Sequence, residues 1–234
     1  MKTIICNQKM YLTKDEAIEL SEAYNNIDFS SVELIVCPGY LNLEYFRNYN
    51  LGAQNCFYED KGAYTGEVSA YDLHLRDIKY CILGHSERRK EDTDEIVNLK
   101  VKACIRNSII PIICIGESKI DREMMRTSSV LKRQISKALK DVELDSKYPI
   151  YIAYEPIYKI GSKTPMRLDE IEDTFTYINK ILEDLKVPNY KILYGGSVKG
   201  NSIKNILSDK IDGYLVGGSC VDKEDLELLI KSIK

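Results

Sequence analysis

Eight short runs of apolar and β-branched residues recur along the whole of the 234-residue sequence, and they restrict the folds open to it. Most of these runs are apolar at every position instead of alternating with polar residues, which is typical of parallel strands covered on both faces. The runs are residues 3–6, 32–37, 51–54, 80–83, 110–115, 150–154, 191–194 and 213–216.

Stretches with helical spacing lie between these runs. The clearest stripe of apolar residues at intervals of three and four is Leu168, Ile171, Phe175, Ile178, Leu182 and Leu185, and two more are expected over residues 124–139 and 226–233. Thr13 and Glu16 have the spacing of a capping box at the start of the first helix. Eight strands alternating with helices, with no linker or low-complexity segment, predict one closed (β/α)8 barrel of parallel strands over residues 1–234, in preference to an open doubly wound sheet.

Charge and cysteine content limit the partners and the location we expect. A net charge of −3 gives no general attraction to nucleic acid or to anionic membranes. The seven cysteines are scattered singly without CxxC spacing, which favours a reduced, cytoplasmic protein. The apolar run in MKTIICNQKM is too short for a signal peptide, and no run approaches the roughly 20 residues that cross a bilayer.

Polar side chains and paired glycines directly follow several of the predicted strands. They are Asn7 and Lys9 after the first strand, His85 after the fourth, Glu155 after the sixth, and the GGS triplets 195–197 and 217–219 after the last two. Functional groups of such barrels gather at the carboxyl ends of the strands, so these residues are expected around one rim. A cation, an imidazole, a carboxylate and two glycine turns suit proton transfer on a phosphorylated carbonyl compound.

Each of these residues, taken singly, also has a simpler interpretation. Lys9 can be a surface charge, Glu155 can merely end a strand before a proline, and His85 can be structural. The double glycines can be plain turns. His74, in a polar helical segment, is assigned no role.

The motifs around these residues resemble those of triosephosphate isomerases over the whole length of the chain. The matching segments are NQKM (7–10), AQN (53–55), GAYTGE (62–67), ILGHSERR (82–89), CIGE (114–117), AYEPIYKIG (153–161), YGGSV (194–198) and DGYLVGG (212–218). ILGHSERR, and AYEP before a lid, are the most specific. The resemblance implies interconversion of dihydroxyacetone phosphate and glyceraldehyde 3-phosphate, without a metal or an organic cofactor.

The resemblance also implies roles for individual residues. Glu155 would be the base that removes a carbon-bound proton, and His85 would act as a neutral electrophile toward the substrate oxygens. Lys9 would offset the negative charge of the intermediate, and Asn7 would position Lys9 and substrate. The HSERR segment (85–89) is expected to begin a helix. Glu87 matches a family residue near the lysine, or is an ordinary carboxylate in the first turn of that helix.

Phosphate binding, lid and dimer contacts are implied in the same way. The phosphate cradle would be formed by Gly161, Ser197, Gly217 and Gly218. Glycine lets the main chain approach an oxyanion closely. The lid would span residues 156–165, with Tyr194 anchoring its closed form, and a homodimer would form through the loop 59–69, with Thr65 at its tip.

The chain departs from the family pattern mainly in the lid. Tyr158 stands where tryptophan is usual, Lys163 changes the tip, and Pro165 stiffens the second hinge. Gln8 likewise replaces a common tryptophan, and Asn179 replaces an arginine that would pair with Asp212.

The departures at Tyr158, Lys163 and Pro165 favour one alternative to an active isomerase, a non-catalytic phosphate-binding scaffold with an impaired lid. A further alternative is a barrel isomerase that acts on a longer sugar phosphate. The pairing of HSERR with AYEP before a lid argues against it.

Overall fold

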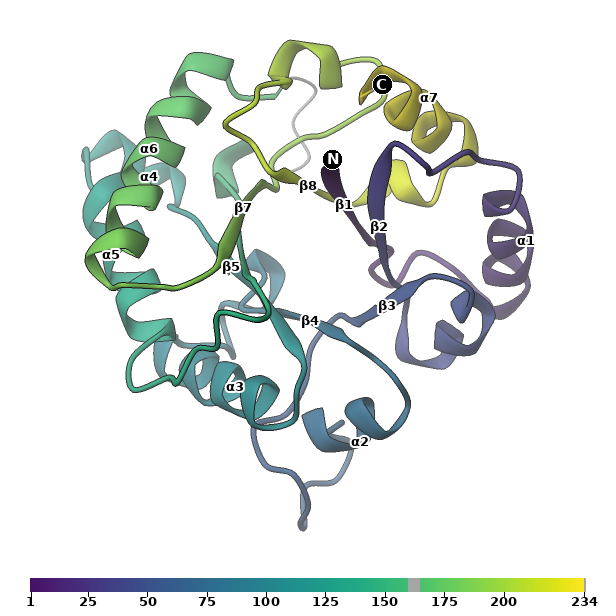
Figure 1. The fold of residues 1–234 in the computed structure, drawn as a ribbon, viewed down its shortest axis with the longest axis horizontal. Helices are drawn as coiled ribbons and strands as arrows, with labels where there is room; N and C mark the ends of the chain where they lie inside the picture. Colours follow the sequence, from purple (N-terminus) through teal and green to yellow (C-terminus); the bar gives the residue numbers. More distant parts are fainter. Residues whose placement is uncertain (160–164, 234) are drawn as a thin grey trace.

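Eight parallel strands close into a barrel in the computed structural model, which describes residues 1–159 and 165–233. The strands pair in chain order, and β1 pairs with β8 to complete the ring (Figure 1). Their bounds are β1 Lys2–Asn7, β2 Val32–Cys37, β3 Asn50–Ala53, β4 Tyr80–Leu83, β5 Ile110–Ile115, β6 Ile150–Tyr154, β7 Tyr190–Tyr194 and β8 Gly213–Val216. The predicted (β/α)8 barrel is confirmed, and five of the eight strands have the predicted bounds.

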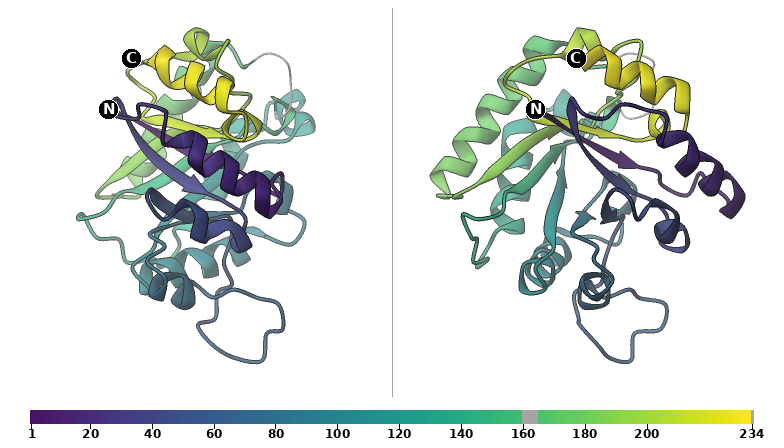
Figure 2. Two further views of the ribbon diagram at one scale, coloured as in Figure 1. Left: turned by 90° about the vertical axis from the view of Figure 1, so that its right-hand side faces the viewer. Right: turned by 45° about the vertical axis from the view of Figure 1, so that its right-hand side comes forward.

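Helices surround the strands on the outside of the barrel (Figures 1 and 2). They are α1 Lys14–Tyr24, α2 Ala70–Leu75, α3 Asp94–Arg106, α4 Lys119–Glu123, α5 Thr127–Ala138, α6 Leu168–Asp184 and α7 Lys223–Ile233. At the start of α1, the Thr13 N–H donates to Oε2 of Glu16 at 2.8 Å, as the capping-box spacing predicts. None of the helices in the described part of the chain combines the length and the hydropathy needed to cross a lipid bilayer.

The strands are apolar on both faces because each face meets a different core. One set of side chains, including Ile5, Ile112 and Leu193, fills the inside of the barrel. A larger set packs between the strands and the helices and includes Ile4, Leu83 and Phe175. Both clusters are removed from water, which is why the runs do not alternate with polar residues.

Closure of the barrel depends on a glycine in β8. Gly213 pairs with Thr3 of β1, and a Cβ at residue 213 would lie 2.0 Å from the carbonyl oxygen of Thr3. No side chain fits at that distance, so the two strands meet only because residue 213 has none.

Two helix predictions are wrong. The stripe over residues 124–139 is broken: α4 ends at Glu123, Met125 has φ of 54°, and α5 begins at Thr127. Met124 is 60% exposed and therefore does not belong to the apolar face of α5. After β4, the HSERR segment forms only one 3₁₀ turn, Ser86–Arg88, instead of an α-helix.

Asp212 needs no arginine partner in this chain. Its side chain is exposed, and Oδ2 accepts a hydrogen bond from the main-chain N–H of Ile192 at 2.7 Å. An exposed carboxylate keeps most of its hydration, so Asn179 in place of an arginine leaves no buried charge unpaired.

Candidate active site

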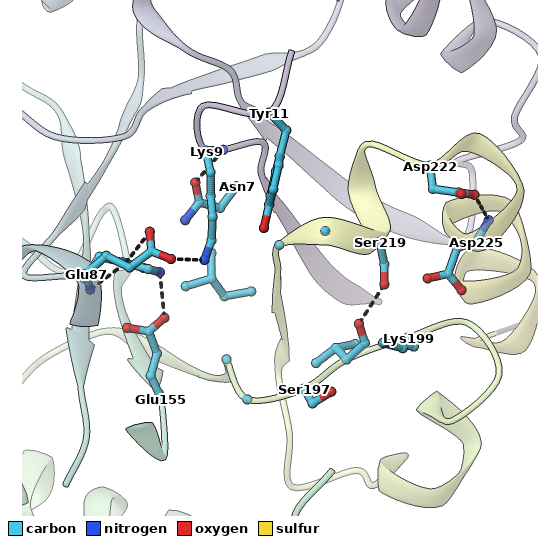
Figure 3. A pocket seen from close by; sticks show the side chains of 17 residues that line it. Asn7, Lys9, Tyr11, Glu87, Glu155, Ser197, Lys199, Ser219, Asp222 and Asp225 are labelled. Carbon is cyan, nitrogen blue, oxygen red and sulfur yellow. Dashed lines mark hydrogen bonds and ion pairs between the residues drawn. The ribbon is translucent and has the colours of Figure 1, made fainter. Parts of the chain in front are cut away.

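The predicted polar residues and glycine turns surround one cavity of about 510 Å³ at the carboxyl ends of the strands. The predicted site residues that line it are Asn7, Lys9, His85, Glu87, Glu155, Ser197, Gly217 and Gly218. Figure 3 shows Lys9, Glu87 and Glu155 on one side of this space, with Ser197 and Ser219 on the loops opposite. Residues that are distant in sequence are thus brought together because parallel strands end at the same face.

Lys9 is held in the cavity by contacts on both its main chain and its side chain. Lys9 has a φ of 50°, which is uncommon for a residue with a Cβ. The Lys9 N–H donates to Oδ1 of Asn7 at 3.2 Å, and this hydrogen bond fixes the turn. Gln54 Nε2 donates to the Lys9 carbonyl oxygen at 2.8 Å. The ammonium lies 2.5 Å from Oε1 of Glu87, so it is paired with a half-exposed carboxylate.

Glu155 and His85 contact one another although they follow different strands. Nε2 of His85 is 3.1 Å from Oε1 of Glu155, and the Ser86 N–H donates to Oε2 of the same carboxylate at 3.2 Å. Both side chains are buried, with 6% of His85 and 3% of Glu155 exposed. The carboxylate is therefore a sheltered acceptor that two groups at the end of β4 hold in place.

The hydrogen bonds of His85 define which of its nitrogens carries the proton in the neutral ring. Nδ1 accepts the main-chain N–H of Glu87 at 3.2 Å, so this nitrogen has no proton of its own. A neutral imidazole carries one proton, which must then be on Nε2. The Nε2–H group faces Glu155 and the cavity, where it can donate to an oxygen.

Two glycine loops form the opposite wall. A Cβ on Gly195 would lie 2.9 Å from Cγ of Glu155, so the first loop leaves room for that carboxylate. A Cβ on Gly218 would have no other atom within 4 Å, so the main chain at this residue is open to the cavity. Ser219 Oγ donates to the Val198 carbonyl at 3.0 Å and ties the two loops together. Exposed main-chain amides beside a lysine are suited to binding an oxyanion.

Comparison with known proteins gives one consistent result. The family model for triosephosphate isomerase matches residues 2–233. Triosephosphate isomerases from Mycoplasma mobile and Clostridium botulinum (strain Langeland) are 39% and 38% identical, each over 98% of this chain and 99% of the relative. That of Endomicrobium trichonymphae is 37% identical over 97% of both chains. The chain belongs to the triosephosphate isomerase family.

The segment after the family's lid is held by Tyr194. Tyr194 is fully buried at the end of β7, and its hydroxyl accepts the main-chain N–H of Met166 at 3.1 Å. Gly161 and Lys163, predicted for the phosphate cradle and the lid tip, lie outside the described residues. The structure describes the two flanks of the predicted lid, which end at Lys159 and begin again at Pro165.

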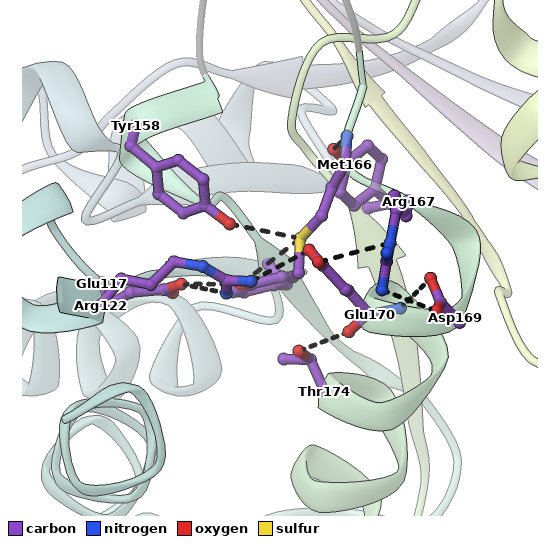
Figure 4. A network of polar contacts seen from close by, with 10 residues as sticks. Glu117, Arg122, Tyr158, Met166, Arg167, Asp169, Glu170 and Thr174 are labelled. Atoms are coloured by element: carbon purple, nitrogen blue, oxygen red, sulfur yellow. Dashed lines mark hydrogen bonds and ion pairs between the residues drawn. The ribbon is translucent and has the colours of Figure 1, made fainter. Parts of the chain in front are cut away.

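The tyrosine that replaces the usual tryptophan of triosephosphate isomerases has its own partners (Figure 4). The Tyr158 hydroxyl lies 3.7 Å from the sulfur of Met166, and the guanidinium of Arg122 lies 5.0 Å from the centre of the Tyr158 ring. Arg122 also pairs with Glu117 at 3.4 Å and with Glu170 at 3.0 Å. These contacts link both flanks of the lid to the ends of β5 and α6, so Tyr158 is integrated in the structure.

The loop predicted to contact a second subunit extends away from the barrel (Figure 2). Its residues 61–67, with Thr65 among them, are exposed. At its base, Oδ1 of Asp60 is 2.9 Å from Nη2 of Arg106 and accepts a hydrogen bond from Nδ2 of Asn107 at 2.8 Å. The Phe57 N–H donates to the Val68 carbonyl at 2.7 Å. The base is thus fixed, while residues 61–67 are exposed to solvent.

Sequence reasoning missed several residues of this region. Gln54 fastens the Lys9 turn and was visible only as part of the AQN motif. Tyr11, Lys199, Asp222 and Asp225 also line the cavity, and no motif marks them. Asp225 Oδ1 accepts the Gly200 N–H at 2.8 Å, so this carboxylate supports the loop after β7. His74, which was given no role, is exposed on α2, away from the cavity.

Proposed function

We propose that this chain interconverts dihydroxyacetone phosphate and D-glyceraldehyde 3-phosphate by proton transfer through an enediolate. The observation that carries the proposal is the contact of 3.1 Å between Nε2 of His85 and the Glu155 carboxylate, inside the cavity that Lys9 and the glycine loops also line. A base, a proton donor and a cation around one small cavity are the groups that this reaction requires.

Glu155 acts as the base of the proposed reaction. It removes a proton from C1 of dihydroxyacetone phosphate, and the electron pair of that C–H bond forms the C1–C2 double bond of the intermediate. The π pair of the C2–O double bond moves to the oxygen, which becomes negative. To reach the carbon, the carboxylate exchanges its contacts with His85 and the Ser86 N–H for the substrate. Return of the proton to C2 gives the aldehyde, so no atom or electron is gained or lost.

His85 and Lys9 stabilise the charge that develops on oxygen. The Nε2–H of His85 donates to the carbonyl oxygen as it becomes negative, and the proton is then passed between the two substrate oxygens. Lys9, whose turn is fixed by Asn7, supplies a positive charge at the same place. Preorganised donors and charges act without reorganising at the moment of reaction. Glu87, paired with Lys9 at 2.5 Å, positions the ammonium.

The phosphate is assigned to the glycine wall. Main-chain amides of Gly217 and Gly218, together with Ser197 and the lid residue Gly161, would bind its oxygens. The lid would exclude water and prevent the intermediate from losing phosphate. Tyr194, which accepts the Met166 N–H at 3.1 Å, would hold the second flank while the lid closes.

We also propose a cytoplasmic homodimer that needs no metal or organic cofactor for catalysis. The seven cysteines are buried free thiols, as suits a reducing compartment, and the exposed loop 59–69 would reach the site of a second subunit. Sedimentation equilibrium tests the dimer: a monomer at all micromolar concentrations contradicts it. Unchanged turnover after dialysis against EDTA is expected from the cofactor-free reaction.

A coupled assay with D-glyceraldehyde 3-phosphate, glycerol-3-phosphate dehydrogenase and NADH tests the function. We expect turnover well above background, with competitive inhibition by 2-phosphoglycolate. Turnover at background would instead favour the non-catalytic scaffold. Activity on a longer sugar phosphate, with none on the triose, would favour the other barrel isomerase.

A further inference from the structure

Three cysteine side chains from separate elements meet behind the fourth strand, outside the cavity just described. Cys56 follows β3, Cys81 lies within β4, and Cys104 lies within α3. Their sulfur atoms all lie within 4.8 Å of one another, and those of Cys56 and Cys104 are 3.6 Å apart. Each side chain is at most 1% exposed. Three thiols thus converge on one point in the core between the strands and α3.

The spacing of the sulfur atoms fits one metal ion. A metal–sulfur bond of about 2.3 Å places the corners of a planar three-sulfur site about 4.0 Å apart. The observed range, from 3.6 Å for one pair to a limit of 4.8 Å for all three, brackets that value. The 3.6 Å pair is a contact between two thiols, since a disulfide bond is about 2.05 Å long.

A buried lysine stands beside the thiol cluster. Lys100 precedes Cys104 by one turn of α3, so both side chains lie on the same buried face of the helix. Its ammonium donates to Asp92 Oδ1 at 2.6 Å and to Oδ1 of Asn55, the neighbour of Cys56, at 2.8 Å. The buried Lys100–Asp92 ion pair, together with Asn55, thus fixes the surroundings of Cys56 and Cys104.

The number of ligands limits the choice of metal. Among the described residues, no fourth histidine, cysteine or carboxylate joins the three thiols. Structural zinc sites almost always have four ligands. Thiolate sulfur is also a preferred ligand of Cu⁺, which accepts three-coordinate sites. The donor set therefore matches Cu⁺ better than Zn²⁺.

We propose that Cys56, Cys81 and Cys104 form a binding site for one Cu⁺ ion. The thiols lose their protons to solvent as the three copper–sulfur bonds form, and copper keeps its oxidation state.

Binding at this site would join three parts of the molecule: β4, α3 and the segment that follows β3. Cys81 is on the strand that leads to His85, and Cys56 begins the segment that leads to the loop 59–69. An ion that binds the folded chain more tightly than the unfolded one raises the unfolding temperature. The bound ion therefore stabilises the folded state and takes no part in the proton transfer.

Competition with the Cu⁺ chelator bicinchoninate, under anaerobic conditions on the reduced full-length protein, tests the proposal. We expect the wild type to withhold one equivalent of Cu⁺, and Cys104→Ala to bind it at least ten-fold more weakly. Cys220→Ala removes an equally buried thiol outside the cluster and should bind like the wild type. Equal binding by the wild type and Cys104→Ala, or equal loss in both variants, would overturn the proposal, as would a folded wild type that withholds no copper.

Two further measurements keep the result independent of any folding defect. Cys56→Ala changes the cluster in the irregular segment, and it replaces Cys104→Ala if circular dichroism shows that variant to be unfolded. X-ray absorption on the copper-loaded protein should give three sulfur neighbours, and Cu⁺ should raise the unfolding temperature of the wild type but of neither cluster variant. Two sulfur neighbours, or equal temperature shifts in the cluster variants, would contradict a three-thiolate site.

Discussion

Nε2 of His85 lies 3.1 Å from Oε1 of Glu155, and the Ser86 N–H holds the second oxygen of that carboxylate at 3.2 Å. The proposed base is therefore positioned by the turn that carries the proposed proton donor. A carboxylate held in this way reaches the substrate only if its side-chain length suits both positions. Small changes in that length should then affect turnover far more than folding.

Glu155→Asp tests this dependence. The substitution withdraws the carboxylate by about 1.5 Å, one carbon–carbon bond. Because a misplacement of about 1 Å costs around 100-fold in rate, kcat should fall by at least that factor. Glu143→Asp makes the same change on an exposed side chain outside the cavity and should retain wild-type turnover. Near-normal kcat in Glu155→Asp, measured by the coupled assay, would exclude this residue as the base.

The tautomer of His85 gives a spectroscopic prediction. Because Nδ1 accepts the Glu87 N–H at 3.2 Å, long-range ¹H–¹⁵N spectra should show an unprotonated Nδ1 and a protonated Nε2. The chain has only two histidines, so His74→Gln assigns the remaining signals to His85. A protonated Nδ1 in the neutral ring would contradict the proposed donor.

The barrel could be predicted from the sequence because burial on both faces of a strand leaves a direct pattern. Runs such as residues 110–115 are apolar throughout, since one face meets the inside of the barrel and the other meets the helices. The convergence of Asn7, His85 and Glu155 followed from their positions after strands. The break between α4 and α5 was missed because the predicted stripe passes from Met124 to Leu131 at helical spacing. It skips Met125, whose φ of 54° no periodicity reveals.

Contacts between distant side chains could not be predicted in this way. Gln54 reaches the carbonyl of Lys9 across two loops, and nothing in either local sequence indicates that hydrogen bond. The three clustered cysteines, Cys56, Cys81 and Cys104, are likewise far apart in the sequence and do not have the spacing of a metal-binding motif. Such groupings depend on the packing of complete elements, here α3 against β4.

Tyr194→Phe should impair the lid and leave the barrel intact. The change leaves the N–H of Met166, which is 2% exposed, without its acceptor, and an unpaired buried donor costs about 1–3 kcal/mol. We expect kcat/KM to fall by roughly ten-fold and more inorganic phosphate to be released per turnover, because a loose lid lets the intermediate eliminate it.

Tyr214→Phe is the matched control for this prediction. Its hydroxyl donates to the Ile206 carbonyl at 2.8 Å, away from the lid, and the residue is fully buried. This variant should lower the unfolding temperature without increasing phosphate release. Equal phosphate release by the two variants would show that the Tyr194 hydroxyl does not hold the lid.

Glu117 should make stability depend on pH. Burial raises the pKa of its carboxyl group, and Oε2 has no hydrogen-bond partner. A folded state that binds this proton more tightly than the unfolded chain loses stability as pH rises from the ordinary glutamate pKa of about 4.3 to the raised value. In urea unfolding, the free energy of unfolding of the wild type minus that of Glu117→Gln should therefore decrease as pH rises through this interval. A constant or rising difference would show that Arg122 and Tyr154 outweigh burial.

Gly218 and Gly213 should separate substrate binding from stability. A Cβ at residue 218 meets no atom within 4 Å, so Gly218→Ala should fold like the wild type. The new methyl group would instead stand at the open wall assigned to the phosphate, so KM should rise about ten-fold or more as close approach to the main chain is lost. A Cβ at residue 213 would lie 2.0 Å from the Thr3 carbonyl oxygen, so Gly213→Ala should lower the free energy of unfolding by about 3 kcal/mol. Coupled assays and urea unfolding of both variants distinguish the two effects. An unchanged KM in Gly218→Ala would contradict the assignment of the phosphate to this loop.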